Sequence, residues 1–119
     1  MIQSRKPRIG FHAPISGGLH NALLLSQELG CQTVQIFSRN PRGWKAKLLS
    51  VEEVKLFRRT RRQTKISPVV IHANYLINLA AADPIMLQKS RESFREELER
   101  GTLLGADYLV VHPGSARGA

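Results

Sequence analysis

The sequence predicts an α/β fold, a parallel sheet covered by helices, arranged as about the first half of a (β/α)8 or TIM barrel. Short apolar segments alternate along the 119 residues with segments of helical periodicity, an order that favours parallel strands joined by helices. A complete barrel needs about 250 residues, so residues 1–119 have room for roughly half of one such domain. A dinucleotide-binding fold is a weaker interpretation, because Gly17-Gly18 lacks the third glycine of that fingerprint.

Two strands and one helix are predicted at the start of the chain. Residues 9–12 form a short extended segment that ends at a turn containing proline and glycine. Leucine and alanine then recur at helical spacing over residues 19–29, and Gly30 supplies a stop for that helix. Residues 33–37 are β-branched and apolar, which is typical of a buried strand, and a long polar loop follows them.

A capping box marks the start of the second helix. The Ser50 side chain can accept from the backbone three residues later while Glu53 reaches back, so a helix begins there and continues to about Gln63. The apolar and β-branched residues at 68–72 then predict a third strand, which begins with a proline. These signals are local, and they indicate one further βα unit.

Start and stop signals also bound the third helix. Asp83 is an N-cap residue followed by Pro84 in the first turn, and the helical pattern continues to about residue 104, where Gly105 ends it. Residues 107–112 form a fourth apolar strand, which the following Pro-Gly pair breaks. The predicted order of strands and helices along the chain is therefore βαβαβαβ.

The basic residues are concentrated in the first half of the chain. The composition is that of a globular protein, with 42% hydrophobic and 23% charged residues, and the net charge is +9. Residues 1–65 have a net charge of +10, and residues 66–119 of −1. Such a field favours a polyanionic partner, most commonly nucleic acid. An equal alternative is a solvated helix face that consists of Arg58, Arg59, Arg61 and Arg62.

The sequence gives no indication of export or of a membrane span. The basic segment 1–10 has no apolar run behind it, as a secretion signal would require. No segment approaches the roughly 20 apolar residues of a membrane span. A single cysteine, Cys31, gives no disulfide framework and is ordinary in a reducing compartment. We therefore expect a cytoplasmic protein.

Histidines lie at the carboxyl ends of three predicted strands, which meet at one edge of a parallel βα fold. They are His12, His72 and His112. The strands of His72 and His112 are expected to be neighbours about 4.8 Å apart, so their imidazoles could share one zinc ion. A single strand-end histidine is more often structural, and no Asp or Glu lies at a strand end to complete the coordination. We expect the metal site to be incomplete within this chain.

The loop after residue 37 combines cations with an aromatic ring. Such a mixture suits contact with phosphates and stacking on nucleobases. The alternative is that Trp44 packs beneath the loop and the cations are simply exposed, and the sequence favours neither. Tyr75, three residues beyond His72, can likewise project beside the metal site or fill a local core. The loop residues considered are Arg39, Asn40, Arg42, Trp44, Lys45 and Lys47.

Four short motifs occur in register, with one βα unit between each and the next. They are Gly10-Phe11-His12 with Ser16-Gly17-Gly18-Leu19, Phe37-Ser38-Arg39-Asn40-Pro41-Arg42-Gly43-Trp44, His72-Ala73-Asn74-Tyr75-Leu76-Ile77-Asn78-Leu79, and His112-Pro113-Gly114-Ser115. The motif that begins at His72 is the most distinctive. Together these motifs, over about residues 8–116, resemble the amino-terminal part of the endonuclease IV family of zinc-dependent apurinic/apyrimidinic (AP) endonucleases.

This resemblance implies a TIM barrel of the xylose isomerase-like type that holds three zinc ions. The family, also named deoxyribonuclease IV, hydrolyses the phosphodiester 5′ to an abasic site in double-stranded DNA, which implies a role in base excision repair. His72 and His112 match two of its zinc ligands. Some of its DNA-contacting residues enter the DNA and hold the abasic nucleotide flipped out. The positions that match its DNA contacts are Asn40, Arg42, Tyr75 and Leu76.

The remaining zinc ligands of that family lie on later strands, so its catalytic residues are not identified in this chain. We therefore expect a truncated product that does not incise DNA by itself. Open sheet edges predict that it self-associates, although a complete family member is expected to be monomeric. Two other functions stay open: a metal-dependent sugar isomerase or epimerase of the xylose isomerase-like barrels, and a non-catalytic basic fragment that binds nucleic acid electrostatically.

Overall fold

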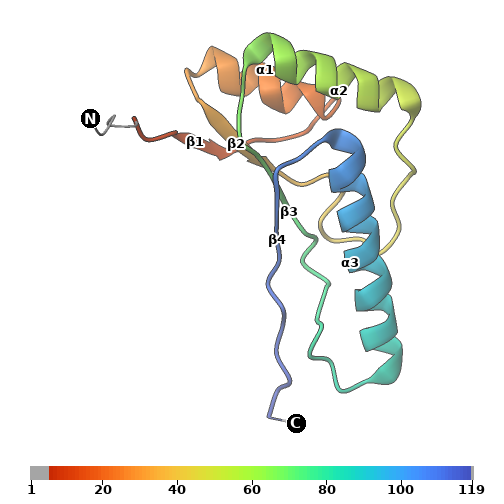
Figure 1. The fold of residues 1–119 in the computed structure, drawn as a ribbon. Helices are drawn as coiled ribbons and strands as arrows, with labels where there is room; N and C mark the ends of the chain where they lie inside the picture. The colour runs from red at the N-terminus through yellow and green to blue at the C-terminus, as the bar shows by residue number, and fades with distance from the viewer. Residues whose placement is uncertain (1–5, 119) are drawn as a thin grey trace.

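The computed structural model describes residues 6–118, in which four strands alternate with three helices (Figure 1). The predicted order is confirmed, and the observed ends differ from the predicted ones by no more than two residues. Residues 1–5, which begin the basic amino-terminal segment, lie outside the described residues, as does residue 119. The elements are β1 (Gly10–His12), α1 (His20–Glu28), β2 (Thr33–Ile36), α2 (Val51–Thr64), β3 (Val69–His72), α3 (Pro84–Leu104) and β4 (Tyr108–Val110).

The four strands form one parallel sheet in the order β1-β2-β3-β4. Each strand pairs with the next one along the chain, so that Gly10 lies opposite Thr33 and His72 lies opposite Val110. A sheet that grows in one direction has no reversal of strand order, which is the feature at which dinucleotide-binding folds place their ligand. The topology therefore confirms the barrel-type arrangement and excludes the dinucleotide-binding interpretation for the described residues.

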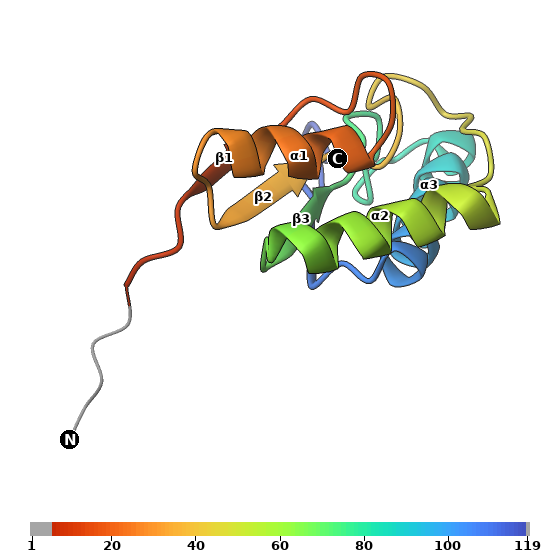
Figure 2. The same cartoon turned by 90° about the horizontal axis from the view of Figure 1, so that it is seen from above.

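The core lies between the helices and one face of the sheet. Figure 2 shows α1 and α2 side by side along the strands. Burial alternates along β2 and β3, because successive side chains point to opposite faces of a strand. Val34, Ile36, Val69 and Ile71 are thus fully buried, together with Phe57 of α2. The residues between them point to the other face of the sheet and are half-buried. The strands, predicted to be buried, are therefore fully buried only on the face that the helices cover.

The structure contains the capping contacts that the sequence predicts at the ends of α2 and α3. Ser50 Oγ accepts from Glu53 N at 3.1 Å and Glu53 Oε2 accepts from Ser50 N at 2.8 Å, which confirms the capping box. Asp83 caps α3 by accepting from Ile85 N at 3.1 Å. Gly105 ends α3 at a φ of 72°, a conformation that glycine adopts without steric cost. None of the helices within residues 6–118 combines the length and apolar character that crossing a membrane requires.

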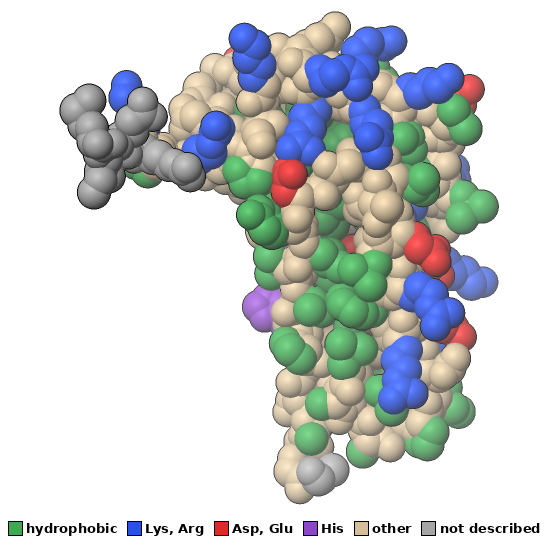
Figure 3. Space-filling view, in the orientation of Figure 1, with side chains coloured by type: hydrophobic (Ala, Val, Ile, Leu, Met, Phe, Trp, Pro, Cys, Tyr) green, Lys and Arg blue, Asp and Glu red, His purple; other side chains and the backbone are tan. Residues whose placement is uncertain are grey.

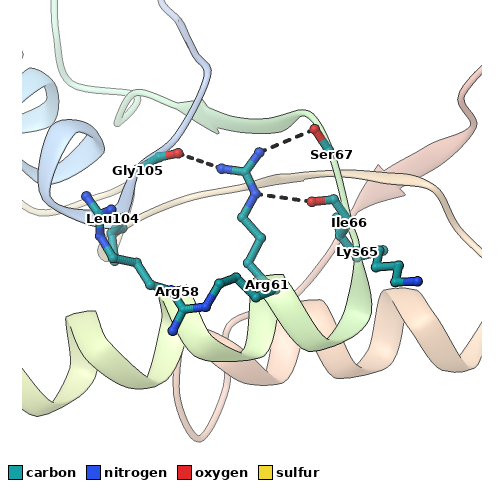
Figure 4. Close-up of a pocket in the computed structure, with 8 residues that line it drawn as sticks. Arg58, Arg61, Lys65, Ile66, Ser67, Leu104 and Gly105 are labelled. Carbon is teal, nitrogen blue, oxygen red and sulfur yellow. Dashed lines mark hydrogen bonds between the residues drawn. The ribbon is translucent and has the colours of Figure 1, made fainter.

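The basic residues of α2 lie at the end of the sheet opposite the strand-end histidines. Figure 3 shows Lys and Arg side chains gathered over the upper end of the molecule, and apolar side chains below them between β4 and α3. Arg61 Nε donates to Ile66 O at 3.1 Å, and another of its nitrogens donates to Gly105 O (Figure 4). Arg61 also forms an ion pair with Asp107, directly before β4. This arginine therefore ties α2 to the starts of two strands.

The alternative of a purely solvated arginine face is wrong for Arg61, which is half-buried. Arg58 donates to two carbonyls in the last turn of α3, and Arg61 makes the contacts just described. Cations beside the free carbonyls of a helix end are stabilising, since those carbonyls carry partial negative charge. Arg58, Arg59 and Arg62 are exposed, as the solvated-face interpretation predicts, and Arg58 combines this exposure with its two hydrogen bonds to α3.

Candidate metal and nucleic-acid site

The carboxyl ends of the strands bring three histidines into one row. His12 and His72 are the last residues of β1 and β3, and His112 follows β4 by two residues. The ring centroids of His12 and His72 are 6.4 Å apart, and those of His72 and His112 are 5.1 Å apart. The structure thus brings together the two residues that the sequence singled out as metal ligands, because their strands are neighbours.

The geometry of His72 and His112 fits two ligands of one zinc ion. His72 Nδ1 lies 2.7 Å from Ala73 O, and a carbonyl oxygen only accepts, so Nδ1 is the donor and the neutral ring presents the lone pair of Nε2 to a metal. Two imidazoles on a tetrahedral zinc, with Zn–N distances of about 2.0–2.1 Å, have ring centroids about 5 Å apart. The observed 5.1 Å matches this separation.

His12 lies beside this pair without completing a metal site. Its Nδ1 lies 2.9 Å from Gln35 Nε2. Burial, and then the charge of His72 when it is protonated, lowers the pKa of His12, which favours the neutral ring. Within residues 6–118, no group of three or more His, Cys, Asp or Glu side chains is arranged to hold a metal ion. Among the described residues, His72 and His112 are therefore the pair whose geometry suits a zinc ion.

Phe37 is an aromatic centre of the site that sequence reasoning missed. Its ring centroid lies 4.4 Å from that of His12, 5.4 Å from that of His72 and 5.2 Å from that of Tyr75. Strand alternation could have located it, because Ile36 is buried on the helix face and the next residue points to the other face. Phe37 packs between the histidines and Tyr75 and holds them in one layer.

Tyr75 and Leu76 lie in the loop after β3, beside His112. Tyr75 is 58% exposed, and all three residues line one cleft of about 690 Å³. Asn74 Oδ1 accepts from Leu76 N at 2.9 Å, and Asn74 Nδ2 donates to Ser93 Oγ at 2.6 Å, which fixes the loop against α3. The alternative that Tyr75 fills a local core does not hold, because a ring this exposed is accessible to a ligand.

The loop after β2 carries Asn40 and Arg42 next to Tyr75. Tyr75 N donates to Pro41 O at 2.8 Å, so a backbone hydrogen bond joins the two loops. Asn40 Oδ1 accepts from Arg42 N at 3.0 Å, which closes a local turn. The side chains of Asn40 and Arg42 are exposed. Together with Leu76, these residues lie at the same edge of the sheet as the histidine pair.

Arg39 and Trp44 do not behave as free nucleic-acid contacts. Arg39 is 4% exposed and donates to Glu96 Oε2 at 2.6 Å and to the Trp44 carbonyl. For Arg39 neither alternative holds, phosphate contact or simple exposure, because acidic side chains of α3 enclose its guanidinium. Trp44 is half-buried, with Lys89 Nζ of α3 6.0 Å from its ring centroid, which supports packing beneath the loop. The loop lysines are exposed, as that alternative predicts.

A hydrogen-bonded bridge fixes the segment after His112. Asn78 Nδ2 donates to Ser115 O at 3.0 Å, and Asn78 Oδ1 accepts from Ser115 N at 3.1 Å. Gly114, between His112 and Ser115, has a φ of 112°, and a Cβ at this position would lie 2.0 Å from Asn78 Oδ1. This position therefore requires glycine. The loops after β3 and β4 form one unit around His112.

A family model matches the segment that carries this site. The model describes the xylose isomerase-like TIM barrel and covers residues 23–119, most of the chain. The chain belongs to the xylose isomerase-like TIM barrel family. This membership confirms the predicted fold class, and it agrees with the sequential order of strands in the sheet.

Relatives of this TIM barrel chain carry endonuclease names. The probable endonuclease 4 of Solibacter usitatus is 49% identical over 93% of this chain and 38% of its own length, and that of Halothermothrix orenii is 42% identical over 93% and 40%. The crystal structure of endonuclease IV from Thermus thermophilus matches with a TM-score of 0.87 and 43% identity, over 93% of this chain and 42% of the solved one. The chain thus spans about 40% of the length of these relatives, and the resemblance expected from the four motifs is confirmed.

Proposed function

We propose that this chain carries the metal-binding and DNA-facing amino-terminal part of a cytoplasmic AP endonuclease of the deoxyribonuclease IV type. The reaction is zinc-dependent hydrolysis of the phosphodiester 5′ to an abasic site in double-stranded DNA, as in base excision repair. The observation that carries this proposal is the meeting of His72 and His112 with the exposed Tyr75 and Arg42 at one edge of the sheet. The endonuclease names of the relatives support it.

His72 and His112 would hold the metal through imidazole nitrogen. Bound zinc supplies positive charge that activates water and stabilises the leaving oxygen of the phosphodiester. The residues of this chain orient the ligands: the hydrogen bond to Ala73 O fixes the tautomer of His72, and Asn78 holds the segment that follows His112. We propose zinc because a pair of imidazoles at this separation suits its tetrahedral coordination.

Arg42, Tyr75 and Leu76 would receive the lesion. An abasic site is already unstacked, so an aromatic or apolar side chain enters the duplex there at a lower cost than elsewhere. The hydrogen bond from Tyr75 N to Pro41 O keeps Arg42 next to Tyr75. The positive charge of Arg42 would attract the phosphates beside the lesion. A sugar isomerase has no need of an exposed cationic loop beside an exposed tyrosine, so the geometry favours the endonuclease.

Preferential binding of an abasic site tests this proposal. Fluorescence anisotropy compares a labelled duplex that contains one abasic site with the intact duplex. We expect wild type to bind the abasic duplex about tenfold more tightly, and Tyr75→Ala to lose most of that preference, because stacking on one aromatic side chain is worth roughly 1–3 kcal/mol. Tyr108→Ala is the control, because Tyr108 is equally exposed but lies at the start of β4, away from the histidines.

A different outcome would identify the non-catalytic alternative. A purely electrostatic binder would bind both duplexes equally, with a steep loss of affinity as salt is raised, and Tyr75→Ala would behave as wild type does. Equal affinity of wild type for the two duplexes would therefore contradict the proposed function.

A further inference from the structure

A carboxylate lies fully buried in α3, behind the loop that follows β2. Glu97 is 0% exposed, and neither of its carboxyl oxygens has a hydrogen-bond partner among the described residues. It forms an ion pair with Arg39, whose Nε lies 3.7 Å from Glu97 Oε1 and likewise has no hydrogen-bond partner in that part of the chain. Burying a charge without hydrogen bonds is costly, so stability alone does not account for a glutamate here.

Two arginines beside this carboxylate hold the backbone of the loop. Arg39 donates to the carbonyl of Trp44. Arg100, one turn further along α3, donates from Nε to Ser38 Oγ at 3.0 Å and from Nη1 to Lys47 O at 2.8 Å, and it also donates to the carbonyl of Ser38. The loop is thus attached to guanidinium groups at its start, middle and end. The loop residues proposed to meet DNA lie between these attachments.

The charges in this cluster depend on Glu97. Arg39 faces it from the loop, Arg100 and Glu96 face it from its own helix, and Glu53 of α2 faces Arg100. Burial raises the pKa of Glu97 to about 7, against the opposing effect of Arg39 and Arg100. Burial and the charge of Arg39 lower the pKa of Arg100. The negative charge of Glu97 offsets the repulsion between the guanidinium groups of Arg39 and Arg100. Without that charge, the repulsion between the two groups would be stronger.

We propose that Glu97 is a positioning residue: in its ionised form it holds Arg39 and Arg100 together, and through them it fixes the loop that carries Asn40 and Arg42 in the conformation that meets DNA. The part that concerns DNA rests on the proposed function. Removing one partner of a buried ion pair leaves the charge of the other less compensated. Arg39 would keep its ion pair with Glu96 at 2.6 Å but lose its second carboxylate, so the effect of the Glu97 charge is expected at Arg39 and in the loop that Arg39 holds.

The single tryptophan of the chain, Trp44, reports on this loop. Glu97→Gln removes the charge and keeps the size, and Glu99→Gln on the exposed side of the same helix is the matched control. At pH 8, where Glu97 is ionised, we expect the acrylamide quenching constant of Trp44 fluorescence to rise about twofold in Glu97→Gln, since a segment that loses its attachments opens locally. It stays at the wild-type value in Glu99→Gln, and far-UV circular dichroism is unchanged in both.

A residue that only stabilises the fold would lower the unfolding temperature without changing this quenching constant in the folded state, and that result would overturn the inference. If Glu97→Gln does not fold, the same quenching measurement on Arg100→Lys takes its place. Lysine keeps the charge but cannot make the three hydrogen bonds by which Arg100 holds the loop, so we expect the quenching constant to rise. An unchanged quenching constant in Arg100→Lys would also overturn it.

DNA binding separates this inference from the proposed function. We expect Glu97→Gln to bind the abasic duplex about three- to tenfold more weakly than wild type, because small displacements of positioned groups reduce affinity and rate strongly. If wild type shows no preference for the abasic duplex, the proposed function fails, while the Trp44 quenching result still decides whether Glu97 positions the loop. Increased quenching with unchanged affinity for the abasic duplex would overturn the role in DNA binding.

Discussion

At the scale of single residues, burial controls the charge of Glu97 more strongly than its arginine neighbours do. Its pKa is raised from 4.5 to about 7. Because the pKa in the folded state is above that in the unfolded state, the folded protein binds the proton more tightly. The resulting stabilisation is fully present below about pH 4.5 and is lost as the pH rises through about 7. Ionised Glu97 therefore opposes folding while it holds the two arginines.

The pH dependence of stability gives a direct test of this charge. We expect Glu97→Gln to gain stability relative to wild type as the pH rises from about 4.5 to about 7, and the difference between the two to be constant above that range. Urea denaturation of both proteins at a series of pH values measures the difference, in which the titration of all other groups cancels. Parallel pH profiles for the two proteins would show that Glu97 has an ordinary pKa.

The histidine pair could be predicted from sequence, whereas the role of Arg39 could not. His72 and His112 end neighbouring strands, so the strand order alone brings them together. The partner of Arg39, Glu96, is 57 residues away in sequence, and no local pattern shows that α3 packs beneath the loop. Phe37 was missed for a different reason, since its position follows from strand alternation but an apolar residue at a strand end carries no chemical signal of its own.

At the scale of helices and strands, the ends of α2 and α3 were predictable because their signals are local. The capping contacts of Ser50 and Asp83 span two or three residues. The position of α2 on the sheet depends on long-range contacts instead. Arg61 reaches Gly105 and Asp107, which are 44 and 46 residues away, and sequence periodicity carries no information about such partners.

Replacing Arg61 should therefore loosen the attachment of α2. We expect Arg61→Met to lower the free energy of unfolding by about 2–3 kcal/mol, since hydrogen bonds from a charged group contribute roughly 1.5–3 kcal/mol. The neighbouring exposed Arg62, replaced by Met, should change it by no more than about 0.5 kcal/mol. Urea denaturation measures both changes. Equal losses in the two variants would contradict the role assigned to Arg61.

At the scale of the whole molecule, the sheet has two open edges. Among residues 6–118, β1 and β4 each pair with one strand only. The large apolar side chains exposed on these strands include Phe11, Tyr108 and Val110. Unpaired backbone groups beside exposed apolar side chains form a template for pairing with another chain.

We expect the 119-residue chain to associate reversibly through these edges. Sedimentation equilibrium should show an average mass above 13.3 kDa that rises with concentration. Val110→Lys should reduce this association, because a charge on an edge strand disfavours pairing. Leu24→Lys, at an exposed apolar residue of α1, should associate as wild type does. A wild-type mass that stays at 13.3 kDa over the full concentration range would contradict edge pairing.

The hydrogen bond from Tyr75 N to Pro41 O has a consequence for evolution. It joins backbone to backbone, so exchange of the Tyr75 side chain leaves the donor in place, and a substitution at Pro41 keeps the accepting carbonyl. A lineage can therefore change the side chains that these two loops present while the loops stay aligned with each other. The backbone link thus preserves the relative position of the two loops whichever side chains stand at positions 41 and 75.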